Sequence, residues 1–150
     1  MQTIHVNSAQ QSPKSTVLIM GDQINRGIAS LADKTPDDTR ILFIELATKF
    51  SDKQWHKQKV HLLLSALKHF AQELREEGFE VDYRIARNLN EGVKAHKRDF
   101  DVTHVIAMEP MNWNGKKILE NLDIELVRNN QFLCHYEDFA EWTKTKTKFK

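Results

Sequence analysis

The sequence predicts an α/β fold in which helices cover both faces of a parallel sheet. Short apolar runs recur along the chain, and helical or polar segments separate them. The length of 150 residues is that of one domain, which buries about two-thirds of the unfolded chain's surface. A composition of 40% hydrophobic and 29% charged residues is typical of a globular protein.

Five segments are predicted to be strands. Thr16–Met20, Arg40–Glu45 and His104–Met108 are apolar on both faces or nearly so, which is typical of strands inside a parallel sheet. Phe79–Ile85 alternates between apolar and polar residues, and Ile124–Val127 is a short run of the same kind. Each of these segments therefore serves as one strand of the predicted sheet.

The clearest helical signal lies between the second and third strands. Seven apolar residues repeat there at helical spacing and form one stripe: Val60, Leu63, Leu64, Leu67, Phe70, Ala71 and Leu74. This pattern predicts a helix over 52–77, and Gly78 is a favourable stop because glycine adopts the left-handed conformation that ends many helices.

The remaining segments give weaker signals. A short helix is predicted over 89–98, with Asn88 or Asn90 as its cap, and another over 112–121. Phe132–His135 is predicted to be a short sixth extended piece, and Asp138–Trp142 to begin a final helical turn. With right-handed crossovers, the simplest arrangement is a three-layer, Rossmann-like, doubly wound sheet in the order 3-2-1-4-5.

Three acidic residues follow strands near the point where this strand order reverses. Gly21, Asp22 and Gln23 come after the first strand, Glu109 follows the fourth, and Glu45 ends the second. Ligands of open parallel sheets bind at this edge, so the three carboxylates are predicted to line one crevice. Carboxylates repel phosphates and accept hydrogen bonds, which favours a neutral ligand rich in donors. Each acid taken singly could instead cap a helix or hold loop backbone.

Several chemistries lack their sequence signatures. There is no G-x-G-x-x-G, no P-loop and no G-x-S-x-G, so nucleotide phosphate binding and serine hydrolysis are disfavoured. The histidines lack the i, i+4 spacing of a zinc helix, although His56 lies near the predicted helix start that overlooks the crevice. The single cysteine, Cys134, excludes a disulfide framework and a four-thiolate cluster within this chain. We therefore predict no catalysis by this chain alone.

The charge pattern and the N-terminal segment bear on partners and location. The last seven residues carry four lysines, and without them the chain has 18 basic and 21 acidic residues, a net charge of −3. This negative net charge disfavours nucleic-acid binding by this chain without a partner, because the phosphate backbone is itself negatively charged. Residues 1–15 are predicted to be a flexible leader, and no secretory signal or membrane-spanning run is present, so a cytoplasmic location is predicted.

Several short strings resemble the deoxyribodipyrimidine photolyase-related proteins, the bacterial cryptochrome/photolyase branch that carries an iron–sulfur cluster. The matching strings are Leu18–Ile24, Phe43–Glu45, His56–Lys59, Ser65–Ala71 with Leu74, Gly78–Tyr83, Glu109–Pro110 with Trp113, and Phe139–Trp142. The resemblance covers roughly residues 16–143, and the order and spacing of the strings make it specific.

The resemblance implies that this chain is the N-terminal α/β domain of a longer protein, with residues 144–150 beginning the interdomain linker. In that family a C-terminal helical domain holds FAD and a [4Fe-4S] cluster and repairs (6-4) photoproducts in DNA with light. The full-length parent is accordingly expected to be a (6-4) DNA photolyase, to bind DNA only as a whole, and to supply the helical domain as partner of this one.

The resemblance also implies a ligand for the α/β domain itself. In relatives this domain can hold an antenna chromophore, 6,7-dimethyl-8-ribityllumazine, which is unphosphorylated and rich in hydroxyl groups. By analogy, its pocket would be formed by Gly21, Asp22, Gln23, Glu45, His56, Lys59, Leu63 and Glu109. Two alternatives stay open: a stand-alone module of this fold that binds another small ligand, and a structural docking module without catalysis.

Overall fold

The computed structural model describes residues 15–49 and 54–146. Within them, five parallel strands form one sheet in the order β3-β2-β1-β4-β5, which confirms the predicted fold class and strand order. The strands are β1 (Ser15–Ile19), β2 (Thr39–Leu46), β3 (Glu80–Ala86), β4 (Val105–Met108) and β5 (Glu125–Val127).

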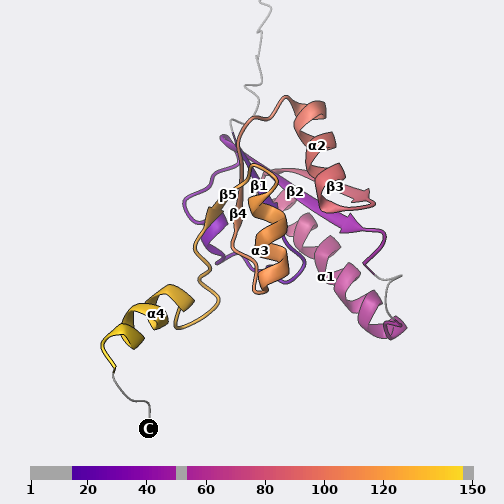
Figure 1. Cartoon of the computed structure of the whole chain (residues 1–150). Coiled ribbons are helices and arrows are strands. Elements are labelled where there is room, and N and C mark those ends of the chain that lie inside the picture. Colours follow the sequence, from indigo (N-terminus) through magenta and orange to yellow (C-terminus); the bar gives the residue numbers. More distant parts are fainter. Residues whose placement is uncertain (1–14, 50–53, 147–150) are drawn as a thin grey trace, which may run out of the picture.

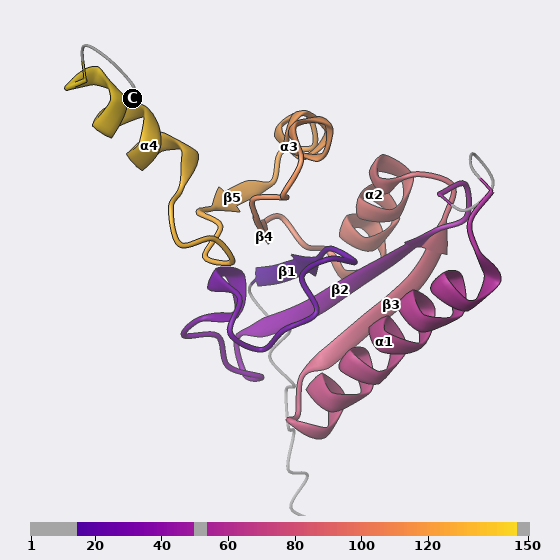
Figure 2. The ribbon, with the colours of Figure 1, turned by 90° about the horizontal axis from the view of Figure 1, so that it is seen from below.

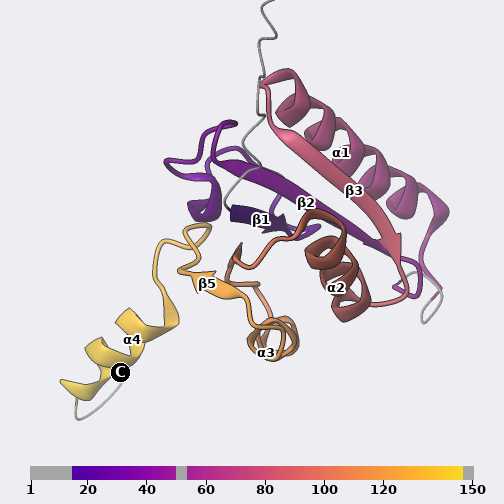
Figure 3. The same cartoon turned by 90° about the horizontal axis from the view of Figure 1, so that it is seen from above.

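The helices form layers on the two faces of this sheet. They are α1 (Lys57–Glu76), α2 (Leu89–Phe100), α3 (Trp113–Glu120) and α4 (Tyr136–Lys144), with a short 3-10 helix, η1 (Ala29–Leu31). Figure 2 shows α1 on one face and α2 and α3 on the other. The last helix, α4, extends away from the sheet and buries none of its residues (Figures 1 and 3).

The core divides into two clusters, one on each face. Val17 and Phe43 point toward α1, whereas their neighbours Leu18 and Leu42 point toward α2 and α3. This division follows from the two-residue repeat of a strand, which sends successive side chains to opposite faces. Because both faces are covered, the central strands are apolar throughout, as the sequence predicts.

Both ends of α1 are set by local contacts. The helix begins at Lys57, because His56 acts as its N-cap and its Nδ1 accepts a hydrogen bond from the Gln58 amide. Residues 54–56 of the predicted helix are not helical, and residues 52 and 53 lie outside the described residues. At the other end Gly78 has a φ of +99°, and the Phe79 amide donates to the Leu74 carbonyl oxygen at 3.0 Å. This is the Schellman arrangement that glycine permits, so the predicted stop is confirmed.

Two other predictions need correction. Residues 132–135 form no strand, because residues 131–134 are a series of bends between β5 and α4. The helix α4 starts at Tyr136 with His135 as its cap, so it is longer than the predicted turn. The cap of α2 is Asn88, whose side chain accepts from the Glu91 amide at 2.9 Å. Within the predicted leader, Ser15 already belongs to β1, and the rest lies outside the described residues, as does 147–150 of the predicted linker.

None of the helices found between residues 15 and 49 or 54 and 146 has the length and apolar character needed to cross a membrane.

Candidate functional site

The side chain of Gln23 fills the position where the strand order reverses. It is fully buried, and its Nε2 donates to the carbonyl oxygens of Met108 at 3.1 Å and Glu109 at 3.2 Å. The Glu109 carbonyl also accepts from Asn129 Nδ2 at 2.8 Å. The Gln23 amide links the segment after β1 to the end of β4, and the Asn129 amide links the segment after β5 to the same place. The Gln23 side chain therefore occupies part of the space predicted between the ends of β1 and β4.

Glu45 borders a small cavity between the ends of β1 and β2 and the first half of α1. This cavity has a volume of about 60 Å³ and is walled mainly by aliphatic residues: Leu18, Ile19, Met20, Gly21, Ile44, Glu45, Leu46, Lys49, Leu63, Leu64, Leu67 and Leu89. Small-molecule pockets usually have at least about 300 Å³.

The Glu45 carboxylate already has a partner of its own. Tyr83 on β3 donates its hydroxyl to Glu45 Oε2 at 2.8 Å. Partial burial, followed by the hydrogen bond to this carboxylate, raises the pKa of Tyr83 well above its usual value. Glu45 therefore turns toward β3, away from Glu109.

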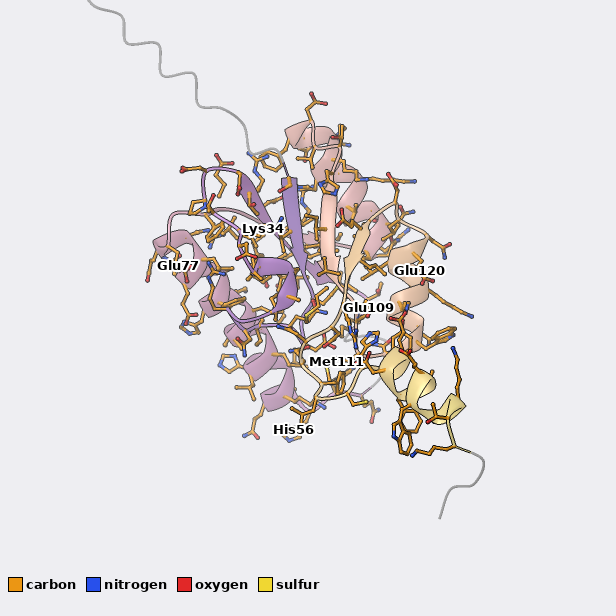
Figure 4. All side chains as sticks on the ribbon, turned by 90° about the vertical axis from the view of Figure 1, so that its left-hand side faces the viewer. Lys34, His56, Glu77, Glu109, Met111 and Glu120 are labelled. Atoms are coloured by element: carbon orange, nitrogen blue, oxygen red, sulfur yellow. The ribbon has the colours of Figure 1, made fainter. Side chains whose placement is uncertain are left out.

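Glu109 is the centre of a second cluster, at the end of β4 (Figure 4). Its side chain is only 13% exposed. Oε2 accepts from His135 Nε2 at 2.7 Å, and Oε1 accepts from Lys116 Nζ at 3.0 Å and from the Tyr136 hydroxyl at 3.2 Å. Lys116 also contacts the Tyr136 hydroxyl. Residues from β4, α3 and the start of α4 thus meet at one carboxylate.

Hydrogen bonds set the charge state of this cluster. Burial by itself would raise the pKa of Glu109, but the hydrogen bonds from His135 and Lys116 outweigh it and lower the pKa to about 2. The hydrogen bonds with Tyr136 and Glu109 raise the pKa of Lys116 above its usual value. At neutral pH the cluster therefore holds a carboxylate and an ammonium group.

The role of His135 fixes which of its ring nitrogens carries a proton. Its Nδ1 accepts a hydrogen bond from the Glu137 amide at 3.3 Å, as the N-cap of α4. A nitrogen that accepts cannot hold the proton, so in the neutral ring Nε2 carries it and donates to Glu109. One side chain thus both caps α4 and attaches it to β4.

A cavity of ligand size lies beside this cluster. Its volume is about 420 Å³, within the usual range for small-molecule sites. It is lined by Glu109, Pro110, Met111, Lys116, Asn129, Phe132, Cys134, His135, Tyr136 and Phe139. Aromatic and apolar walls with a few polar groups at one end are typical of a site for a flat organic molecule.

The predicted site residues are divided between these places. Gly21, Glu45 and Leu63 line the small cavity, whereas Glu109 lines the larger one. Asp22 is exposed and borders neither of these two cavities, and its carbonyl oxygen accepts from Gln131 Nε2 at 3.2 Å. Neither of these two cavities is lined by all three carboxylates, and a crevice shared by Asp22, Glu45 and Glu109 stays a prediction.

The remaining two predicted site residues, the N-cap His56 and Lys59 of α1, line neither cavity. His56 is at the N-terminal end of α1, well apart from Glu109 in Figure 4. Lys59 is exposed, with its ammonium nitrogen 4.7 Å from the centre of the Trp55 ring. Sequence reasoning missed Lys116, His135 and Tyr136. A usable signal was present at His135, which directly precedes a helix whose first turn contains acidic residues.

One further cluster has the hydroxyl–histidine–carboxylate hydrogen bonds of a hydrolase triad, but its hydroxyl group is not accessible to a substrate. His96 Nε2 lies 2.9 Å from Thr16 Oγ1, and His96 Nδ1 lies 2.6 Å from Asp82 Oδ2. Thr16 and His96 are fully buried between β1 and α2, so no substrate reaches the hydroxyl. This cluster stabilises the packing of α2 on the sheet. Across residues 15–49 and 54–146, no group of three or more His, Cys, Asp or Glu is placed to hold a metal ion.

Comparisons with known proteins agree on one family. The family model described as deoxyribodipyrimidine photo-lyase-related protein matches residues 17–150. A (6-4) photolyase of Agrobacterium fabrum is 30% identical over 138 residues, which covers 84% of this chain. The matched part spans 27% of that relative's own length.

Proposed function

This chain belongs to the deoxyribodipyrimidine photolyase-related protein family, and on that premise we propose that it is the antenna-type α/β domain of a light-dependent DNA-repair protein. FAD, a [4Fe-4S] cluster and contact with a (6-4) lesion in DNA would belong to a helical domain that this one adjoins. The cytoplasmic location stays a prediction.

The observation that carries this proposal is the 420 Å³ cavity at the carboxyl edge of the sheet. Its polar end pairs one carboxylate with one ammonium group, and its side walls are apolar. A neutral, polar, flat chromophore such as 6,7-dimethyl-8-ribityllumazine suits that combination better than a phosphorylated nucleotide, because phosphate would meet Glu109.

The chain's own residues would only bind and orient such a chromophore. When bound, a lumazine supplies light absorption and passes the energy to a flavin by dipolar coupling, which makes or breaks no bond in this domain. The α/β domain therefore has to hold the chromophore ring in a fixed orientation. The aromatic side chains of Phe132, Tyr136 and Phe139 provide flat surfaces against which that ring can pack.

The chain purified from bacterial cells tests this proposal. We expect an absorbance band beyond that of tryptophan, and heat should release a compound with the mass of 6,7-dimethyl-8-ribityllumazine. Colourless protein that also leaves added lumazine unbound in equilibrium dialysis would contradict the proposal.

A second role, docking to the helical domain, is favoured by a different observation. Eight of the eleven large apolar residues that are exposed in the described part of the chain lie between residues 111 and 142: Met111, Trp113, Ile118, Phe132, Leu133, Tyr136, Phe139 and Trp142. Such an accumulation marks a surface that another protein part covers. The alternative of a structural module rests on this surface.

Binding to the helical part of the Agrobacterium relative tests the docking role. We expect a complex in size-exclusion chromatography that Leu133→Ser weakens, since this side chain is the most exposed of the eight. The matched control is Leu62→Ser, which removes an exposed leucine from α1. Equal effects of the two variants would count against docking by this surface.

A further inference from the structure

We propose that two copies of this chain associate through α4, with the aromatic faces of the two helices packed together in an antiparallel pair. The inference goes beyond the proposed function, because it concerns the chain without a helical domain. The contact is symmetric, since the same face of α4 takes part in both copies. A helical domain docked on this surface would exclude the second copy.

The first argument is an apolar face of α4 that the described part of the chain leaves uncovered. The helix extends away from the sheet and buries none of its nine residues (Figures 1 and 3). Tyr136, Phe139 and Trp142 are each about half exposed, and with Ala140 they recur at spacings of three and four residues, which places them on one side of the helix. A helix this short gains most of its stability from packing such a face against another element.

The second argument is the distribution of charge along α4, which identifies a second copy as the element that covers this face. The first turn contains Glu137 and Asp138, and the last turn contains Lys144. Seven residues make about two helical turns, so Glu137 and Lys144 lie on the same flank at opposite ends of the helix. In an antiparallel pair, Glu137 of each copy therefore lies beside Lys144 of the other. A parallel pair would place like charges side by side.

The third argument is that the charged and the apolar residues require the same symmetry axis. A two-fold axis that brings Glu137 opposite Lys144 passes between residues 140 and 141, and it also brings Phe139 opposite Trp142. The small side chain of Ala140 lies next to this axis and allows the two helices to approach closely. Within one copy the Phe139 and Trp142 rings already lie side by side, with their centres 5.9 Å apart. Four aromatic rings would thus form the centre of the interface.

The fourth argument is that the position of α4 is fixed before association. His135 caps the helix and lies 2.7 Å from Glu109 after β4, and Asp138 forms an ion pair with Arg128 after β5. These contacts attach the first turn to the rest of the domain, while the aromatic face stays exposed. Because the helix is held in place, pairing requires little additional ordering of the chain.

Sedimentation equilibrium of the 150-residue chain tests this inference. We expect the mass to rise with concentration from 17.5 kDa toward about 35 kDa, twice the mass of one chain. Glu137→Lys and Lys144→Glu each place like charges at both ends of the pair and should weaken association about tenfold. An equimolar mixture of these two variants should restore association, because both ion pairs then join opposite charges. The control is Glu73→Lys, the same charge change at an exposed position of α1, which should leave association unchanged.

The outcomes separate this inference from the proposed function. A chain that stays at 17.5 kDa up to about 200 µM overturns the inference, and binding of that monomer to the helical part of the Agrobacterium relative would leave the docking role intact. A dimer that the two charge variants do not weaken, or that their mixture does not restore, has its contact elsewhere and also overturns the inference. A colourless chain that dimerises as described supports the inference while contradicting the antenna role.

Discussion

Gln23 joins β1 to β4, because its side-chain Nε2 donates to the carbonyl oxygen of Met108 at 3.1 Å. The two residues are 85 positions apart in the sequence, and their contact closes the point where the strand order reverses. Open parallel sheets commonly bind ligands at this point. Here the ligand-sized cavity lies further along the same edge, beside Glu109 and the start of α4.

Replacing Gln23 should therefore destabilise the fold. Gln23→Ala leaves the Met108 carbonyl without this donor in a buried setting, which costs about 1–3 kcal/mol. Urea denaturation measures the change in the free energy of unfolding. Gln131→Ala is the matched control, since Gln131 is exposed and should change stability by less than about 0.5 kcal/mol. Equal losses in the two variants would argue against a structural role for Gln23.

The buried His96 should contribute more to stability than an exposed histidine. His96→Ala removes a fully buried ring and its hydrogen bonds to Thr16 and Asp82. The expected loss is about 2–5 kcal/mol, the range for large-to-small substitutions in a core. His69→Ala, at an exposed position of α1, is the control. Thermal melting that gives both variants the same midpoint would show that this cluster does not hold α2 on the sheet.

Gly92 marks the closest approach of α2 to the sheet. A Cβ atom at this position would lie 2.8 Å from the Cδ1 atom of Ile44 and 2.9 Å from its Cγ2 atom. We expect Gly92→Ala to destabilise the protein by about 1–3 kcal/mol through overpacking. Gly21→Ala is a suitable comparison, because its nearest neighbour would be Leu67 at 3.8 Å, an ordinary contact. If urea denaturation shows no greater loss for Gly92→Ala, the helix has room to shift.

The low pKa of Glu109 makes stability depend on pH in the acid range. The folded-state pKa is about 2 and the ordinary value is 4.5, so the stabilisation is complete above about 4.5 and disappears as the pH falls toward 2. Glu109→Gln should therefore lose less stability than the unmodified chain over this interval. Unfolding free energies at a series of pH values measure both slopes, and parallel slopes would contradict the prediction.

His135 should control the order of α4. His135→Ala removes the N-cap of α4 and the hydrogen bond to Glu109, so amide hydrogen exchange across residues 136–144 should become faster. His56→Ala is a matched control, because it removes the equivalent cap of α1 at an exposed position that has no carboxylate partner within residues 15–49 and 54–146. An effect confined to the Glu137 amide would mean that the contact with Glu109 does not hold α4 in place.

The strands, their order and the end of α1 could be predicted from the sequence because they depend on local patterns. Apolar runs such as Val17–Ile19 identify strands that are covered on both faces, and alternating strands and helices allow few topologies. Gly78 ends α1 because few other residues adopt its positive φ readily. These features require only the repeat of a strand or helix and the conformational freedom of one residue.

Tertiary contacts alone decided that Glu45 and Glu109 line different cavities. Strand ends place Glu45 and Glu109 at one edge of the sheet, but Tyr83 on β3 turns the first away, and His135, 26 residues further along, holds the second. Which partner a carboxylate finds depends on strand register and on how loops pack, and neither has a sequence period. The sequence by itself therefore determined the sheet and its edge, whereas three-dimensional packing decided which side chains share a cavity.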